Sequence, residues 1–181
     1  MIMGCMFAGK TTELIRRCHE HEMSGKNVLI LKFAADKRYG DDITIVTHSG
    51  IKASALAMDR LADFGNKFLD YDVIGVDEGQ FFEDTVEFAE KVASHGKIVI
   101  VSSLQGTFKR GPFHSILNLI PKCEDITKLS AICKLCKHPA SFTFRTASQN
   151  NQCMIGGEDM YMPLCRECHE RETKKQGNNT F

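Results

Sequence analysis

The chain has 181 residues, which suits one medium domain or one main domain with a small satellite. Lys plus Arg and Asp plus Glu both number 23, so no global field favours nucleic acid or an anionic membrane. No apolar run approaches the ~18 residues of a membrane span, and no basic segment precedes a signal-like core. We therefore expect a cytoplasmic protein.

Amphipathic segments and short apolar runs alternate along roughly the first 122 residues. Helical spacing or capping residues predict helices over residues 11–24, 51–69, 83–94 and 112–119. Apolar, β-branched runs predict buried strands over residues 27–33, 43–48, 71–77 and 97–102. Strands that alternate with helices indicate an α/β fold with a parallel sheet and flanking helices.

A glycine-rich motif opens the chain. It fits the phosphate-binding pattern G-x-x-x-x-G-K-[ST] without deviation and comprises Gly4, Cys5, Met6, Phe7, Ala8, Gly9, Lys10 and Thr11. Its backbone N–H groups and the positive end of the following helix are expected to face phosphate, with Lys10 at the β/γ-phosphates and the Thr11 hydroxyl on Mg²⁺. A chance glycine turn is the alternative. Residues 1–3 alone precede the motif, so the first strand is a stub, or the given sequence lacks its N-terminus.

An apolar run over residues 73–76 ends in two adjacent acids, Asp77 and Glu78. Because side chains alternate along a strand, the two should point in different directions. Asp77 then suits Mg²⁺, and Glu78 suits a general base for a substrate hydroxyl. A solvated acidic turn is the alternative. Arg38 follows a predicted strand and is a candidate for stabilising a transferring phosphoryl group, although loop arginines are usually just solvated.

Four of the eight cysteines form two C-x-x-C pairs, Cys133/Cys136 and Cys165/Cys168. Without a secretory signal, paired cysteines indicate metal rather than disulfides, and four thiolates suit a structural Zn²⁺ site. A redox dithiol or unrelated buried thiols are the alternatives. We expect a P-loop α/β domain over residues 1–128, a zinc-binding domain over 129–171 and a disordered tail over 172–181. Short strands are expected over 141–146 and 152–155.

The order of these motifs resembles the type II thymidine kinase family. The resemblance spans residues 4–168 and rests on 36–39 (DKRY), 73–82 (VIGVDEGQFF), 107–113 (TFKRGPF), 116–119 (ILNL), the cysteine pairs and 155–157 (IGG). It implies a P-loop NTPase-type sheet plus a zinc-ribbon-like domain that carries a "lasso" loop. It also implies transfer of the ATP γ-phosphate to the 5′-hydroxyl of thymidine or deoxyuridine in nucleotide salvage, a homotetramer, and inhibition by thymidine triphosphate.

The resemblance assigns roles by position. It makes Glu78 the catalytic base and places further residues around the nucleotide phosphates and the metal: Asp36, Lys37, Arg38, Asp77, Gly79 and Gln80. Phe108 resembles the aromatic beside the nucleoside. The segment whose backbone reads the pyrimidine matches Gln152, Cys153, Met154, Ile155 and Gly156, together with Tyr161. From the residues alone, the Gly156–Gly157 pair is as well explained by a hairpin turn. Phe81, Leu104 and Phe113 are candidates for the nucleoside pocket or for plain core.

Two other functions are compatible with parts of the sequence. An adenylate-kinase-like nucleoside monophosphate kinase would also carry a P-loop and a zinc lid, but the acid pair and the C-terminal position of the cysteines are atypical of it. A non-enzymatic P-loop and zinc-ribbon module would bind nucleic acid or protein through a basic ribbon. Four acids offset the basic residues of that region: Glu158, Asp159, Glu167 and Glu170.

Overall fold

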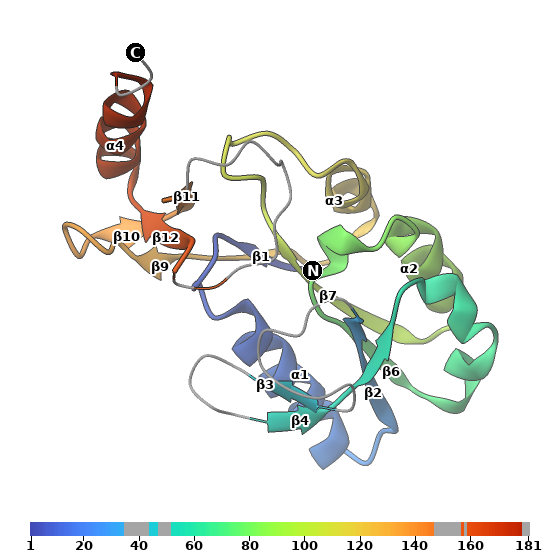
Figure 1. The fold of residues 1–181 in the computed structure, drawn as a ribbon. Helices are drawn as coiled ribbons and strands as arrows, with labels where there is room; N and C mark the ends of the chain where they lie inside the picture. The colour runs from blue at the N-terminus through green and yellow to red at the C-terminus, as the bar shows by residue number, and fades with distance from the viewer. Residues whose placement is uncertain (35–43, 47–51, 147–156, 158, 179–181) are drawn as a thin grey trace.

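A computed structural model describes residues 1–34, 44–46, 52–146, 157 and 159–178 of the chain (Figure 1). Its centre is a six-stranded sheet with the order β5-β2-β6-β7-β1-β8, in which every neighbouring pair is parallel. The strands are β1 (Ile2–Gly4), β2 (Val28–Phe33), β5 (Leu56–Met58), β6 (Val73–Val76), β7 (Ile98–Leu104) and β8 (Thr127–Leu129). The predicted parallel α/β sheet is confirmed.

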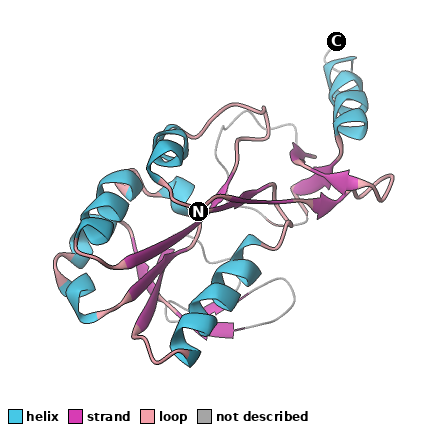
Figure 2. Ribbon diagram, turned by 180° about the vertical axis from the view of Figure 1, so that it is seen from behind, coloured by secondary structure: helices cyan, strands magenta, loops and turns pink. Residues whose placement is uncertain are grey.

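Helices cover both faces of this sheet (Figures 1 and 2). On one face lies α1 (Lys10–Met23), whose buried Leu14 and Cys18 pack with Val73 and Ile100. The opposite face carries two α-helices and four short 3₁₀ turns: α2 (Thr85–Ser94), α3 (His114–Leu119), η1 (Leu61–Phe64), η2 (Lys67–Asp70), η3 (Gly79–Phe81) and η4 (Ile120–Lys122). None of the helices among the described residues has the length and hydrophobicity needed to cross a bilayer.

The first strand is three residues long, as the short N-terminal run predicts. Although short, β1 lies between β7 and β8, and Ile2 is fully buried. The terminal ammonium of Met1 donates to the Asp125 carbonyl at 2.6 Å, and the Thr127 amide donates to the Met1 carbonyl at 2.9 Å. Pairing on both sides therefore holds this strand in the sheet.

The helix predicted over residues 51–69 is wrong. The chain forms β4 (Lys52–Ser54) and β5 there, followed by η1 and η2. The apolar side chains of Leu61, Phe64 and Phe68 are all buried, but they come from two separate turns whose spacing imitates a helix. The described part of the strand predicted over 43–48, β3 (Thr44–Val46), pairs antiparallel with β4 outside the main sheet.

After β8 the architecture becomes antiparallel. β9 (Ala131–Ile132) pairs with β10 (Pro139–Ala140), and β11 (Phe142–Arg145) pairs with β12 (Tyr161–Leu164). A final helix, α4 (Arg166–Asn178), follows, and Figure 1 shows it extending away from the sheet. We call residues 131–178 the cysteine unit, because all four paired cysteines lie within it.

The tail predicted to be disordered over 172–181 is helical as far as Asn178. Two interactions explain the difference. The Gln176 amide donates to the Arg145 carbonyl at 3.0 Å, and Lys175 forms an i,i+3 ion pair with Glu172 at 2.9 Å. The prediction rested on the polar composition of the tail. That composition does not reveal that the tail continues a helix which begins at the second cysteine pair.

Packing of α1 on the sheet should contribute strongly to the stability of this fold. The variant Leu14→Ala leaves a cavity at a fully buried position and should lower the free energy of unfolding by about 2–5 kcal/mol. The control Leu117→Ala, at a position on α3 that is 51% exposed, should change it by less than about 0.5 kcal/mol. Equal midpoints for the two variants in urea denaturation would contradict this assignment of the core.

Candidate active site

Three neighbouring strands bring the predicted site residues to one edge of the sheet. β1, β7 and β6 are adjacent and parallel, so their carboxyl ends meet. The glycine-rich loop (residues 4–11) follows β1, the two acids follow β6, and Leu104 ends β7. In open α/β sheets, ligands bind in the crevice outside the carboxyl ends of the strands. The sheet topology therefore brings together the two motifs that the sequence shows 66 residues apart, at Thr11 and Asp77.

The glycine-rich loop is tightly shaped. A Cβ atom on Gly4 would lie 2.8 Å from the Leu129 carbonyl oxygen, so a side chain there would displace β8. Phe7 and Gly9 have φ angles of 65° and 81°, which turn successive peptide groups toward one side. The loop leads directly into α1 at Lys10, whose Nζ donates to the Cys5 carbonyl at 3.0 Å. Lys10 is buried, at 7% exposure.

Asp77 is the centre of the polar network. Its carboxylate accepts hydrogen bonds from the Thr11 hydroxyl, at 3.2 and 3.1 Å to the two oxygens, and from the Ser102 hydroxyl. Burial raises the pKa of Asp77 to about 7, and the charge of Glu78 adds to this. The two hydroxyl donors and Lys10 act in the opposite direction. A carboxylate and a hydroxyl in contact form an oxygen donor set of the kind that Mg²⁺ prefers.

Glu78 occupies an unusual backbone conformation. Its φ and ψ are 52° and 43°, in the left-handed region that non-glycine residues adopt at an energetic cost of order 1–3 kcal/mol. Gln80 holds the side chain: its amide nitrogen donates to Glu78 Oε2, and its amide oxygen accepts from the Leu104 N–H at 2.9 Å. The Thr85 hydroxyl donates to the Gly79 carbonyl at 2.7 Å and so restrains the turn that follows Glu78. Glu78 is thus held in place on a turn that hydrogen bonds restrain.

Phe108 and Tyr161, which are distant in sequence, share a common neighbour. The Arg145 guanidinium carbon lies 5.1 Å from the centre of the Phe108 ring and 6.0 Å from that of Tyr161. Arg145 and Tyr161 are buried, and Phe108 is half-buried. The Gly157 carbonyl accepts from the Tyr161 amide at 3.1 Å, in a turn just before β12. The two predicted nucleoside-side aromatics therefore belong to one cluster.

Several predicted site residues cannot be placed. Eight candidates lie outside the described residues: Asp36, Lys37, Arg38, Gln152, Cys153, Met154, Ile155 and Gly156. The strand predicted over 152–155 lies there too. The candidates left between pocket and core, Phe81, Leu104 and Phe113, are all half-buried.

Three residues that shape the site are absent from the sequence candidates. Ser102 donates to Asp77, Thr143 accepts from the Met6 amide at 3.0 Å, and Arg145 stacks on the aromatic cluster. Ser102 did carry a usable signal, because it ends a predicted strand next to the one that precedes Asp77. Thr143 and Arg145 carried none, since their contacts arise only when the cysteine unit packs against the loop.

The four paired cysteines converge. Cys133 and Cys136 lie between β9 and β10, and Cys165 and Cys168 lie at the start of α4. Their Sγ atoms all lie within 4.8 Å of one another. Sulfur atoms around a tetrahedral Zn²⁺ with Zn–S distances of ~2.3 Å would lie about 3.8 Å apart, so this set fits zinc. Burial of the Cys133 thiol opposes ionisation, but backbone N–H donors outweigh it and lower its pKa to about 6.

Comparison with known proteins agrees with this geometry. The family model described as thymidine kinase matches residues 1–169. Thymidine kinase 1 of Dictyostelium discoideum is 43% identical over 99% of this chain and 80% of its own length. The thymidine kinases of Monkeypox virus and of Vaccinia virus (strain Ankara) are each 46% identical over 93% of this chain and 94% of theirs. The chain therefore belongs to the thymidine kinase family.

Proposed function

We propose that this protein is an ATP-dependent thymidine kinase of nucleotide salvage, which phosphorylates the 5′-hydroxyl of thymidine or deoxyuridine. The observation that carries the proposal is the convergence of the glycine-rich loop, Asp77 and Glu78 at one sheet edge. The names of the viral and Dictyostelium relatives support thymidine as the acceptor. The same comparisons weigh against an adenylate-kinase-like enzyme and against a non-enzymatic module.

The glycine-rich loop and α1 would bind the ATP phosphates. Backbone N–H groups of the loop and the N-terminus of α1 supply donors and positive potential, and Lys10 supplies a full charge. On phosphate binding, Lys10 would exchange its contact with the Cys5 carbonyl for the phosphate oxygens. Thr11 and Asp77 would hold Mg²⁺, which neutralises charge on the β- and γ-phosphates. The resemblance adds Asp36, Lys37 and Arg38 to this phosphate site.

Glu78 would act as the general base. As the 5′-oxygen of the nucleoside forms its bond to the γ-phosphorus, Glu78 accepts the hydroxyl proton. The bond from that phosphorus to the bridging oxygen breaks, and ADP leaves with the electron pair. Gln80, which donates to Glu78 Oε2, keeps the carboxylate directed. The turn at η3 thus positions the base before substrate arrives.

The cysteine unit would complete the acceptor site. Tyr161 and Phe108 border it, and the segment over 152–156 would supply backbone groups for the pyrimidine. Zinc at the four cysteines is then structural, because all four positions are taken by protein ligands. The resemblance also supports a homotetramer and inhibition by thymidine triphosphate. In this proposal the sheet domain binds ATP, and the cysteine unit helps to bind the nucleoside.

Removing the proposed base should abolish turnover without abolishing ATP binding. Glu78→Gln should lower kcat on thymidine by about 10²- to 10⁴-fold, with the KM for ATP nearly unchanged. The control Glu87→Gln alters an exposed carboxylate on α2 and should keep wild-type kinetics. Initial rates on a panel of nucleosides and nucleoside monophosphates measure both claims. Wild-type activity confined to monophosphates, or a fully active Glu78→Gln variant, would contradict the proposal.

Magnesium-dependent ATP binding should follow the ionisation of Asp77. Because its pKa is raised to about 7, Asp77 is mostly protonated at pH 6 and mostly ionised at pH 8. Only the ionised form holds Mg²⁺ well, so the magnesium-dependent gain in ATP affinity should rise about tenfold over this range. Calorimetric titration with a non-hydrolysable ATP analogue, with and without Mg²⁺, measures the gain. A pH dependence that persists in Asp77→Asn would assign it to another group.

Folding stability should respond to Asp77 in the opposite sense. The folded-state pKa lies above the ordinary value of 3.8, so the folded chain binds the extra proton. Without nucleotide, the free energy of unfolding should therefore fall as pH rises from about 4 to about 7, because over this range the folded chain holds a proton that the unfolded chain has lost.

Zinc should be bound stoichiometrically and support the cysteine unit. Cys133→Ser removes one of the four ligands and should leave the chain without tightly bound zinc and with a lower melting temperature. Cys123→Ser, at a half-buried position outside the cluster, should retain one zinc per chain. Elemental analysis and thermal denaturation measure the difference. Zinc retained in full by Cys133→Ser would rule out the four-cysteine site.

A further inference from the structure

The glycine-rich loop is supported from behind by the cysteine unit. The Met6 amide donates to the Thr143 hydroxyl at 3.0 Å, in a buried contact between residues 137 positions apart. The neighbouring Cys5 thiol donates to the Ala140 carbonyl, with Sγ and O 3.4 Å apart. Both contacts lie on consecutive residues of the loop. They join it to the segment that runs from β10 into β11.

Packing reinforces these hydrogen bonds. Cys5 belongs to the buried apolar cluster of the cysteine unit, which also includes Cys133, Cys168, Phe144 and Leu164. Two further loop residues, Phe7 and Ala8, pack against the edge of the same cluster. One side of the loop is therefore part of the core that surrounds the zinc ligands.

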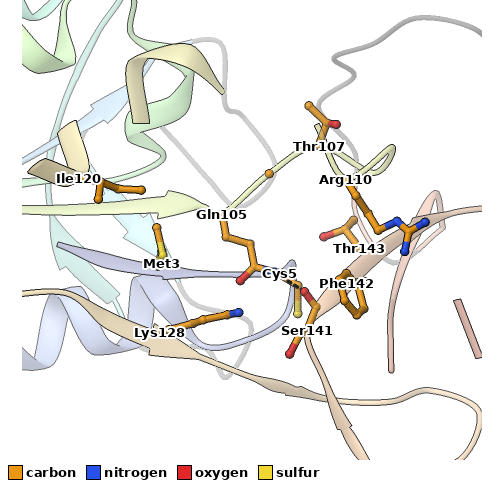
Figure 3. Close-up of a pocket in the computed structure, with 11 residues that line it drawn as sticks. Met3, Cys5, Gln105, Thr107, Arg110, Ile120, Lys128, Ser141, Phe142 and Thr143 are labelled. Atoms are coloured by element: carbon orange, nitrogen blue, oxygen red, sulfur yellow. Dashed lines mark hydrogen bonds between the residues drawn. The ribbon is translucent and has the colours of Figure 1, made fainter. Parts of the chain in front are cut away.

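Gln105 makes a third connection between the two parts. Its backbone N–H donates to the Gly4 carbonyl at 3.2 Å, and its side-chain amide donates to the Ser141 carbonyl. Figure 3 shows the Gln105 side chain reaching from the end of β7 toward Ser141, with Cys5 beside it. Cys5, Gln105, Ser141 and Thr143 also line a pocket of about 340 Å³ at this junction. Loop, β7 end and cysteine unit thus share a single junction.

We propose that Thr143 is a positioning residue for the glycine-rich loop, through which the cysteine unit sets the geometry of the ATP phosphate site. The inference rests on the proposed function in one respect, that this loop binds the phosphates of ATP.

The physical reason lies in the conformation of the loop. Phe7 has a φ of 65°, a conformation that a non-glycine residue keeps only when its surroundings enforce it. Thr143 provides that restraint from a rigid site, because it is buried and pairs with Pro163 in the β11–β12 ladder. If its hydroxyl is removed, the buried Met6 N–H loses its acceptor. The loop can then move so that the Met6 N–H finds another acceptor. The neighbouring N–H groups of the loop would no longer be oriented toward the phosphates.

A hydroxyl-specific variant pair tests this role. Thr143→Val replaces the hydroxyl by a methyl group of similar size, whereas Thr143→Ser keeps the hydroxyl. Titration calorimetry of the zinc-loaded full chain with Mg-ATP, without nucleoside, gives the dissociation constant. We expect Thr143→Val to raise it about tenfold, from the loss of one buried hydrogen bond. Thr143→Ser should stay within about threefold of wild type.

A stability-matched control separates positioning from general destabilisation. Leu61→Ala opens a cavity at a fully buried position on η1, in a separate apolar cluster that contains no residue of the loop. It should lower the melting temperature but leave the dissociation constant for Mg-ATP within about twofold of wild type. If Leu61→Ala weakens ATP binding as much as Thr143→Val does, Thr143 has a merely structural role and the inference is wrong.

The remaining outcomes are distinguishable. Wild-type affinity in Thr143→Val would overturn the inference and leave the proposed kinase intact. Normal ATP binding by a protein that phosphorylates no nucleoside would defeat the proposed function, and the variant comparison would still decide the role of Thr143. A wild-type chain that does not bind Mg-ATP would overturn both.

Discussion

A buried carboxylate joins the parts of the site. Asp77 directly follows β6, accepts a hydrogen bond from Ser102 of β7, and contacts Thr11 in the first turn of α1. Burying an ionisable group without partners is unfavourable, and these two hydroxyls offset part of that cost. The raised pKa, about 7, indicates that the compensation is incomplete until a cation binds. The site is therefore assembled around a buried carboxylate whose charge a bound cation would balance.

Other side chains restrain two residues of the site whose backbones are strained. Glu78 and Phe7 both have positive φ angles, of 52° and 65°. Gln80 of η3, which is itself anchored by the Leu104 N–H at the end of β7, restrains Glu78, and Thr143 of the cysteine unit holds the amide next to Phe7. Strain of this kind persists where the surrounding structure determines it, which is why both residues depend on partners from other elements. This edge of the sheet is accordingly preorganised by contacts with the end of β7 and with the cysteine unit.

The cysteine unit has more than one structural connection to the sheet. Its aromatic cluster around Arg145 lies on the proposed nucleoside side, and its apolar core around Cys133 extends to Cys5 of the glycine-rich loop. Zinc held by the four cysteines would stabilise this unit and the loop residues that pack on it. Both proposed substrates would then depend on one small antiparallel unit.

Local patterns in the sequence determined the elements whose residues interact with near neighbours. The apolar runs predicted β2, β6 and β7, the G-x-x-x-x-G-K-[ST] spacing predicted the loop and the start of α1, and the cysteine spacing predicted the four-sulfur cluster. These predictions hold because a strand, a loop that leads into a helix, and a C-x-x-C pair are each formed by a short stretch of chain. The helix expected over residues 51–69 is wrong because residues 56–58 pair with β2 as an edge strand, a contact distant in sequence that the local pattern does not show. The contacts of Thr143 with Met6 and of Arg145 with Phe108 were decided by tertiary structure alone, because each joins residues from different elements that only the packed sheet and cysteine unit bring together.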